Sequence, residues 1–354
     1  MVIKLWKGLI DKYKKFLPVS ENQRIVSLNE GNTPLIKADW LNNEFGFELY
    51  LKFEGANPTG SFKDRGMTLA VTKALEENSK AIICASTGNT SASAAAFGAR
   101  SGLNTLVVVP RAKIAKGKLS QALIYGAQII PVEGNFDKAL EIVRKLVDKY
   151  PLTLVNSLNP FRIEGQKTAA FEVADQLDKE KLDILALPVG NAGNITAYWK
   201  GFKEYHKKGY IDYLPKMYGF QACGSAAMVK QKVIEKPETI ATAIRIGNPV
   251  NRKKAKKAKD ESNGLFDSIT DQEIENAHRL LAAKEGVFVE PASVSPVAGL
   301  IKLSKEKPEL IKGKRIVAVL TGNGLKDQEF VLDNYSIPEA VEGNLNKVEE
   351  IINI

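Results

Sequence analysis

Short apolar runs rich in β-branched residues alternate with longer amphipathic stretches along most of the chain, and this alternation constrains the fold more than any other feature. The stretches between the runs carry apolar residues three or four positions apart, which is typical of helices. Strands that alternate with helices predict an α/β protein with mostly parallel sheets. The run ILALPV (184–189) is apolar throughout, as expected for a strand that helices cover on both faces. Strands are predicted at 49–53, 81–86, 105–110, 128–134, 152–156, 183–190, 217–222, 242–247 and 315–322.

The length and the distribution of apolar residues limit the class of protein. A chain of 354 residues is too long for one ordinary domain, so two domains are expected. No apolar run approaches about 18 residues, which excludes a transmembrane helix. The N-terminus mixes lysines and an aspartate with apolar residues, unlike the apolar core of a secretion signal. We therefore expect a cytoplasmic protein with no membrane partner.

Cysteine and histidine are scarce, which limits the chemistry of any site. The two cysteines, Cys84 and Cys223, lie far apart in apolar surroundings and are expected to be buried free thiols. The two histidines, His206 and His278, lie in helical patterns and are expected on helix surfaces. These residues are too few for a zinc site or a well-placed catalytic triad, so no metal is expected.

The net charge of +9 includes one strongly basic block, RKKAKKAK at 252–259. A nucleic-acid surface is one interpretation of this block. A solvated helix is the favoured interpretation, because no aromatic residues are interleaved for base stacking and Asp260 and Glu261 follow at once. We therefore expect no nucleic-acid partner.

Four loops, each after a predicted strand, hold the candidate site, because α/β sheets bind ligands at the carboxyl ends of their strands. The first, NPTGSFKDRG (57–66), brings Lys63 to the start of a helix, where the helix dipole favours the neutral, nucleophilic amine. The second, STGNTS (86–91), places hydroxyls and free N–H groups at another helix start, as a carboxylate or phosphate site would require. Taken alone, Lys63 could be a surface lysine and the hydroxyls ordinary helix caps.

The third loop, GNAGN (190–194), has two glycines that let several N–H groups converge on a phosphate dianion. It matches neither GxGxxG nor a Walker A loop, which disfavours a dinucleotide or ATP. The fourth, TGNGLKD (321–327), places the Thr321 hydroxyl at a strand tip, where it can meet a ring nitrogen without adding a charge; a simple glycine turn is the alternative. An activated lysine, a phosphate cradle, a carboxylate cradle and a neutral hydroxyl are together the parts of a pyridoxal 5'-phosphate (PLP) site.

These motifs make the sequence resemble the threonine synthases of the shorter bacterial and archaeal type, within the tryptophan synthase β family of PLP enzymes (fold type II). STGNTS together with NSLNPFRIEGQKT (156–168) is the most specific part, because PTGSFKDRG and GNAGN are shared in part with threonine dehydratase and cysteine synthase relatives. One departure is visible: EPASVSP (290–296) stands where a run like EPASAAS is expected, and Pro296 puts the start of the following helix in question. Matching segments cover nearly the whole chain, at 28–36, 52–67, 83–96, 155–168, 187–201, 289–299 and 320–327.

The resemblance implies a role for each matching residue. Lys63 would bond to PLP as a Schiff base and serve the proton transfers, Asn89 would contact the phenolic oxygen of PLP, and Thr321 its ring nitrogen. Arg162 suits a substrate phosphate, because guanidinium makes bidentate contacts to it. The PLP phosphate would be held by Gly190, Asn191, Ala192, Gly193 and Asn194. The carboxylate and phosphate of the substrate would be bound by Ser86, Thr87, Thr90, Asn156, Ser157 and Arg162.

The implied fold has two open, mostly parallel twisted sheets with helices on both faces, and an active site in the cleft between two domains. Residues 1–56 and 157–354 would form the larger domain, and 57–156 a small domain inserted in it. The implied activity is a lyase reaction in a homodimer: O-phospho-L-homoserine and water give L-threonine and phosphate by γ-elimination and β-replacement. A PLP-dependent threonine or serine dehydratase is the alternative, although it has no use for a phosphate pocket at Arg162; a PLP-binding regulatory protein without turnover is another.

Overall fold

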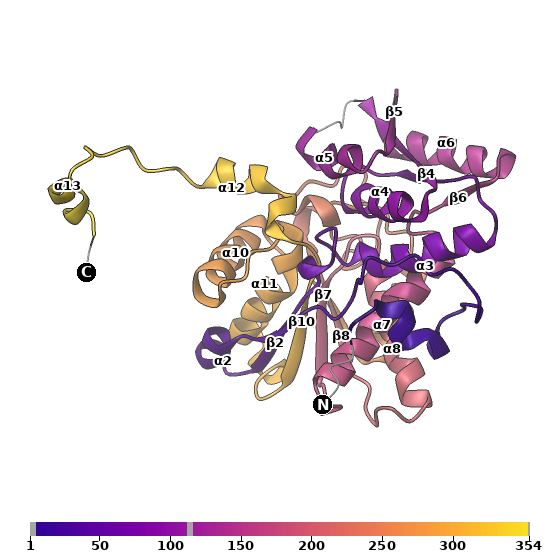
Figure 1. Cartoon of the computed structure of the whole chain (residues 1–354). Helices are drawn as coiled ribbons and strands as arrows, with labels where there is room; N and C mark the ends of the chain where they lie inside the picture. Colours follow the sequence, from indigo (N-terminus) through magenta and orange to yellow (C-terminus); the bar gives the residue numbers. More distant parts are fainter. Residues whose placement is uncertain (1–4, 112–115, 353–354) are drawn as a thin grey trace.

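The structure is a computed structural model that describes residues 5–111 and 116–352, and the strands among these residues form two sheets (Figure 1). Six described strands make the larger sheet, and all neighbours in it are parallel except β1 and β2, which are antiparallel. In spatial order they are β1 (Leu35–Lys37), β2 (Glu48–Phe53), β10 (Arg315–Leu320), β7 (Ile184–Pro188), β8 (Lys216–Ala222) and β9 (Leu265–Ile269). Four described strands make the smaller, fully parallel sheet, in the order β5 (Gln128–Val132), β4 (Asn104–Pro110), β3 (Ala81–Ala85) and β6 (Leu152–Leu154).

Helices cover both faces of each sheet, so the predicted α/β architecture is confirmed (Figure 1). Around the larger sheet lie α1 (Leu9–Tyr13), α2 (Asp39–Phe45), α7 (Pro160–Gln176), α8 (Gly193–Lys207), α9 (Arg252–Glu261), α10 (Asp271–Glu285) and α11 (Pro291–Glu306). Around the smaller sheet lie α3 (Lys63–Glu76), α4 (Asn89–Ser101), α5 (Lys116–Ile124) and α6 (Phe136–Lys149).

Strand β7 shows why a run that is apolar throughout becomes a central strand. Successive side chains of a strand point to opposite faces. Leu185 and Leu187 pack into the core that contains α7 and α8, whereas Ile184 and Ala186 pack into the core that contains α10 and α11. Both faces of β7 are therefore covered, as the ILALPV run predicted.

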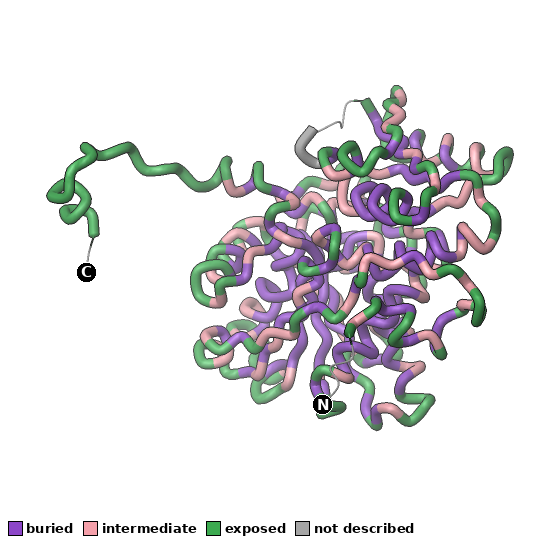
Figure 2. The backbone as a smooth tube through the Cα atoms, in the orientation of Figure 1, coloured by how far each residue is buried: buried purple, intermediate pink, exposed green. Residues whose placement is uncertain are grey.

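The C-terminal segment contrasts with this packed body. After α12 (Gln328–Asn334) the chain leaves the body and is exposed through α13 (Leu345–Glu349) to residue 352 (Figure 2). In residues 5–111 and 116–352, no helix combines the length and the apolar character that a membrane crossing needs.

Three local predictions are wrong. Cys84 is buried as expected, but Cys223 is only partly buried. The run at 242–247 is not a strand, because Thr242–Ile244 forms a 3-10 turn. Ile244 packs against Gly190, and a Cβ on Gly190 would lie 3.1 Å from the Ile244 Cα. The outer strand is instead β9, whose sequence LFDSI mixes polar with apolar residues and gives a weaker pattern. His278 is also not on a surface, because the rings of Phe288 and Phe330 cover it and leave it only 3% exposed.

Helix α11 begins at Pro291 and continues through Pro296, which answers the question raised by the sequence departure. Proline has no N–H to donate to the carbonyl four residues earlier. The hydroxyl of Ser295 donates to that carbonyl, on Ala292, at 2.8 Å. The serine beside the proline therefore satisfies the acceptor that Pro296 leaves without its usual partner.

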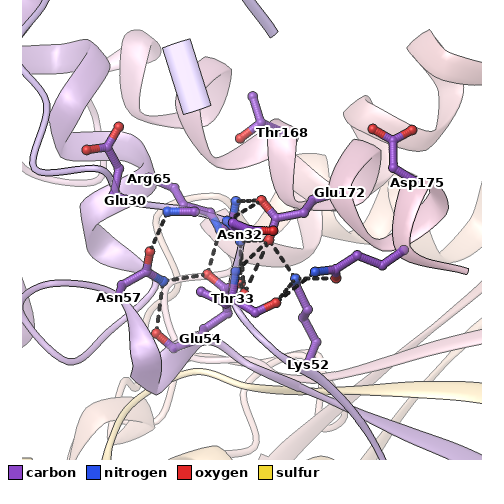
Figure 3. Close-up of polar contacts among 12 residues, drawn as sticks. Glu30, Asn32, Thr33, Lys52, Glu54, Asn57, Arg65, Thr168, Glu172 and Asp175 are labelled. Carbon is purple, nitrogen blue, oxygen red and sulfur yellow. Dashed lines mark hydrogen bonds and ion pairs between the residues drawn. The ribbon is translucent and has the colours of Figure 1, made fainter. Parts of the chain in front are cut away.

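A group of buried charges ties β2 to two helices (Figure 3). Arg65 of α3 donates to Glu54, just after β2, at 2.6 and 2.7 Å, and to Glu172 of α7 at 2.7 and 3.0 Å. Lys52 of β2 also donates to Glu172, at 2.6 Å. These four side chains belong to residues that are at most 2% exposed. Burial alone would raise the pKa of Glu172, but Arg65 and Lys52 hold it well below its ordinary value.

The substitution Lys52→Met should destabilise the protein by about 3–5 kcal/mol, because it leaves two buried carboxylates, Glu54 and Glu172, with Arg65 as their one remaining ion-pair partner in the described group. The pKa of Glu172 is lower in the folded protein than its unfolded value of 4.5, so the ionised carboxylate stabilises the fold above about pH 4.5. This stabilisation is lost as the pH falls toward the folded-state pKa. Without Lys52 the pKa of Glu172 in the folded protein should rise toward 4.5, so this acid-side loss should become smaller. Urea unfolding between about pH 2.5 and 8 measures both effects. Lys203→Met, which removes a partly exposed ion pair, is the control and should cost less than about 1 kcal/mol; equal losses would contradict the expectation.

Candidate active site

Lys63 is the first residue of α3, and the loop before it is bonded to the end of β10. Ser61 pairs with Gly322 in an isolated bridge. The Phe62 N–H donates to the carbonyl of Thr321 at 3.0 Å. These contacts bring the predicted cofactor lysine and the predicted ring-nitrogen partner to one place.

Asp64 holds the same loop from its other side. Its buried carboxylate accepts from the N–H and the hydroxyl of Thr59, at 2.7 and 2.6 Å. It also accepts from the hydroxyl of Ser93 on α4, at 2.6 Å. The loop that carries Lys63 is thereby fixed to the helix that begins with Asn89.

The Lys63 amine lies 3.9 Å from the centre of the Phe62 ring. Burial lowers the pKa of Lys63 to about 7; the positive charge of Arg162 adds to this effect and the negative charge of Glu290 opposes it. A large share of the amine is therefore neutral at physiological pH, which is the form that attacks a carbonyl carbon. The sequence predicted a neutral amine from the position of Lys63 at a helix start, whereas in the structure burial is the main cause of the lowered pKa.

Asn89 begins α4, and its side-chain amide meets Glu290, just before α11. The Asn89 Nδ2 donates to both carboxylate oxygens of Glu290, at 3.1 and 3.0 Å. Ser293, in the first turn of α11, lies 2.9 Å from the Thr321 hydroxyl and accepts from the Gly322 N–H at 2.7 Å. The start of α4, the start of α11 and the tip of β10 therefore converge.

Arg162 is a buried arginine with unused donor capacity. It lies in the first turn of α7 and is 2% exposed. One terminal nitrogen donates to the Val155 carbonyl at 3.1 Å, but its Nε has no hydrogen-bond partner among the described residues. No carboxylate in residues 5–111 or 116–352 forms an ion pair with it. Burial lowers its pKa to about 10, so it is still a cation at neutral pH. A buried cation with a free donor and no ion pair in the described part of the chain is a candidate ligand for a bound anion.

The GNAGN loop is shaped like an anion cradle at the start of α8. Ala192 has a φ of +62°, a left-handed conformation that non-glycine residues rarely adopt. No described side chain caps α8, and the Nδ2 of the buried Asn194 finds no partner in the described part of the chain. An anion bound at this uncapped helix end would satisfy these donors.

Of the other predicted substrate-binding residues, some bond to backbone groups in the structure and others are partly exposed. The amide of Asn156 makes two bonds of 2.9 Å to the backbone of Ala85, which fixes the end of β3. The Ser86 hydroxyl accepts from the Gly88 N–H at 3.2 Å. Thr87, Thr90 and Ser157 are partly exposed. Their binding roles stay predictions.

Glu290, Ser293 and Asp64 were missed as site residues. All three lie next to predicted site residues or within a quoted motif, but no local pattern indicates that they belong to the site. The contact between α4 and the start of α11 joins residues about 200 positions apart, so the sequence does not reveal it.

The site therefore has a lysine of lowered pKa and buried hydrogen-bond donors without described partners at two separate places, Arg162 and Asn194. These features fit a phosphate-bearing aldehyde at GNAGN and a second phosphate at Arg162. In the described residues, no group of three or more His, Cys, Asp or Glu is arranged to hold a metal.

Comparison with known proteins agrees with this geometry. Residues 26–322 match the family model described as pyridoxal-phosphate dependent enzyme. Two solved structures share the fold: maize serine racemase, with a TM-score of 0.74 at 19% identity (92% of this chain, 96% of that one), and a fungal L-serine ammonia-lyase from Rhizomucor miehei, with a TM-score of 0.75 at 21% identity (88% and 98%). The fold and the site thus define a PLP-dependent enzyme of fold type II.

The curated relatives narrow the class. The threonine synthase of Halalkalibacterium halodurans is 59% identical over 96% of this chain and 95% of its own length. The threonine synthase of Methanocaldococcus jannaschii is 52% identical over 96% of this chain and 86% of its own. The chain belongs to the threonine synthase family, as the resemblance predicted, and PLP is its cofactor.

The Lys63 amine should titrate near pH 7 in the cofactor-free protein, and Arg162→Met should raise its pKa because a neighbouring cation is removed. A rise of about one unit would lower the neutral fraction at pH 7 about fivefold. Trace labelling with acetic anhydride between pH 5 and 10, followed by peptide mass mapping, measures this titration. Arg279→Met, on the exposed face of α10, should leave it unchanged; an unchanged titration in Arg162→Met would refute the coupling.

Proposed function

We propose that this site converts O-phospho-L-homoserine and water to L-threonine and phosphate, with Lys63 as the base and Arg162 as the ligand of the substrate phosphate. The unpaired, buried Arg162 is the observation that carries the proposal. Arg162 packs against the first turn of the helix that begins with Lys63, where a Cβ on Gly66 would lie 3.1 Å from the Arg162 Cα. A phosphate held by Arg162 would therefore lie near the proposed base. A dehydratase substrate has no phosphate and would leave this guanidinium unpaired.

When bound, PLP supplies the electron withdrawal that acidifies the substrate carbon next to the amine. Lys63 then takes the proton from Cα and serves the later proton transfers at Cβ. A pKa near 7 suits this role, because the same amine can accept and return a proton at neutral pH. Arg162 holds the phosphate while the Cγ–O bond breaks and stabilises the charge that leaves with it.

The remaining predicted residues would hold the cofactor and the rest of the substrate. Residues 190–194 would bind the PLP phosphate, supported by the uncapped start of α8 and the free donor of Asn194. Asn89 would contact the phenolic oxygen and Thr321 the ring nitrogen, with Lys63 bonded to the aldehyde carbon. Thr87, Thr90 and Ser157 would contact the substrate directly, whereas the bonds of Asn156 and Ser86 to backbone groups favour a supporting role.

We also propose the domain division given above, because one sheet contains β1, β2 and β7–β10 and the other β3–β6. A cytoplasmic location is supported by two free cysteines. The absence of a nucleic-acid partner is supported by α9, where Lys256 and Lys257 pair with Asp260 and Glu261 one turn later.

Arg162→Met should raise the KM for O-phospho-L-homoserine by about tenfold to a hundredfold, since a charge-assisted contact is worth roughly 1.5–3 kcal/mol. Its affinity for PLP should change less than threefold, because the cofactor phosphate lies at the other anion site. Phosphate release with threonine as co-product gives the kinetics, and cofactor absorbance gives the binding. Equal losses of both affinities, or a keto acid as the product of the unaltered enzyme, would contradict the proposal.

The proposed homodimer is supported by the C-terminal segment, where Ile337, Leu345 and Ile351 are 87%, 71% and 62% exposed. Apolar side chains gathered on one exposed segment are typical of a subunit contact. Removal of residues 336–354 should therefore halve the molar mass measured by light scattering. Loss of a dimer in the variant supports the proposal, whereas an unchanged dimer, or a full-length monomer, contradicts it.

A further inference from the structure

Glu290 is a buried carboxylate that the predicted chemistry does not use. It is 6% exposed and precedes the first turn of α11. Its hydrogen bonds come from the Asn89 amide and, at 3.4 Å, from the Ser293 hydroxyl. Across the described ranges, no lysine or arginine lies close enough to form an ion pair with it. A buried carboxylate without an ion pair is costly to a fold, so its place in the site calls for a function.

The backbone around Glu290 is shaped to admit this side chain. A Cβ on Gly322 would lie 2.5 Å from its Oε1, closer than real contacts allow. The Glu290 N–H donates to the Gly322 carbonyl at 3.2 Å, and Val289 pairs with Asn323 in an isolated bridge. The glycine after Thr321 therefore gives the carboxylate room to reach Asn89.

Several charged groups act on Glu290 from the surrounding elements. Burial raises its pKa and Asp327 adds to this, whereas the bond from Asn89 and the charges of Lys63 and Lys326 lower it. In return, Glu290 favours the charged form of Lys63, against the effect of Arg162. The Lys63 amine thus responds to one negative and one positive neighbour.

The direction of the Asn89 bond adds a second effect. An ionised carboxylate can only accept hydrogen bonds, so Glu290 fixes the Asn89 nitrogen toward itself. An amide nitrogen has two hydrogens, and the second remains available for a cofactor oxygen. A freely rotating Asn89 would present its own oxygen to that atom for part of the time.

We propose that Glu290 is a positioning residue, which orients the Asn89 amide toward the cofactor and balances Arg162 at the Lys63 amine. The inference rests on the proposed cofactor contacts of Asn89 and Lys63. It adds that Glu290 sets the orientation of the first and the charge balance at the second. It assigns no proton transfer to Glu290 itself.

Two variants separate the charge from the orientation. Glu290→Gln removes the charge, and the pKa of Lys63 in the cofactor-free protein should fall. A fall of about one unit would make acetic anhydride labelling at pH 6 about fivefold faster. Glu290→Asp keeps the charge but shortens the side chain, so labelling should stay near that of the unaltered protein. In the PLP-loaded protein, Glu290→Asp should change the circular dichroism band of the cofactor, because the shortened side chain no longer reaches Asn89. Glu290→Gln keeps an amide oxygen that can accept from Asn89, so its band should change less.

Glu306→Gln, at the exposed end of the same helix, is the matched control and should alter neither signal. Folded Glu290→Gln protein with unaltered labelling and an unaltered band would overturn the proposal. If Glu290→Gln does not fold, Glu290→Asp decides: normal labelling with a changed band supports the proposal, and an unchanged band or altered labelling overturns it. Labelling needs no substrate, so turnover of O-phospho-L-homoserine by the unaltered enzyme tests the proposed function separately.

Discussion

The bonds of Arg65 to Glu54 and Glu172 are the interaction on which the rest of the site depends (Figure 3). They fasten the first turn of α3 to the end of β2 and to α7, and Lys63 lies only two residues before Arg65. The helices also approach closely, because a Cβ on Gly165 would lie 2.1 Å from the Arg65 carbonyl oxygen. Arg162 lies one turn before Gly165 on α7. The contact that buries Arg65 therefore also sets where Lys63, the proposed base, and Arg162, the proposed phosphate ligand, lie relative to each other.

Burial has opposite consequences for the two sets of charges in this protein. In the group around Arg65, cations and carboxylates are matched, and the fold gains a rigid junction. At Arg162 and Asn194, donors are buried without partners among the described residues, and this costs the fold free energy that the proposed anions would restore. The same dry surroundings lower the pKa of Lys63. If these donors hold the two phosphates as proposed, the protein should be less stable without its ligands, which would link ligand binding to stability.

Much of this could be predicted from the sequence, and the exceptions have physical reasons. The strands and the four loops were predictable because parallel strands are apolar throughout and end in glycine-rich turns, as ILALPVGNAGN shows. The run at 242–247 has strand-like composition but packs against Gly190 without a partner strand, which depends on tertiary contacts. His278 is buried by Phe330 from a later helix. Glu290 escaped notice because its partner, Asn89, lies about 200 residues away, and local patterns carry no information about such contacts.

In the proposed reaction, O-phospho-L-homoserine loses its phosphate by cleavage at carbon and gains a hydroxyl at Cβ. Turnover of O-phospho-L-homoserine in water enriched in oxygen-18, followed by mass spectrometry of both products, tests this most directly. The label should enter the hydroxyl of threonine, and the released phosphate should keep only its original oxygen atoms. Label in the phosphate, with homoserine as the other product, would show hydrolysis at phosphorus and rule out the proposed reaction.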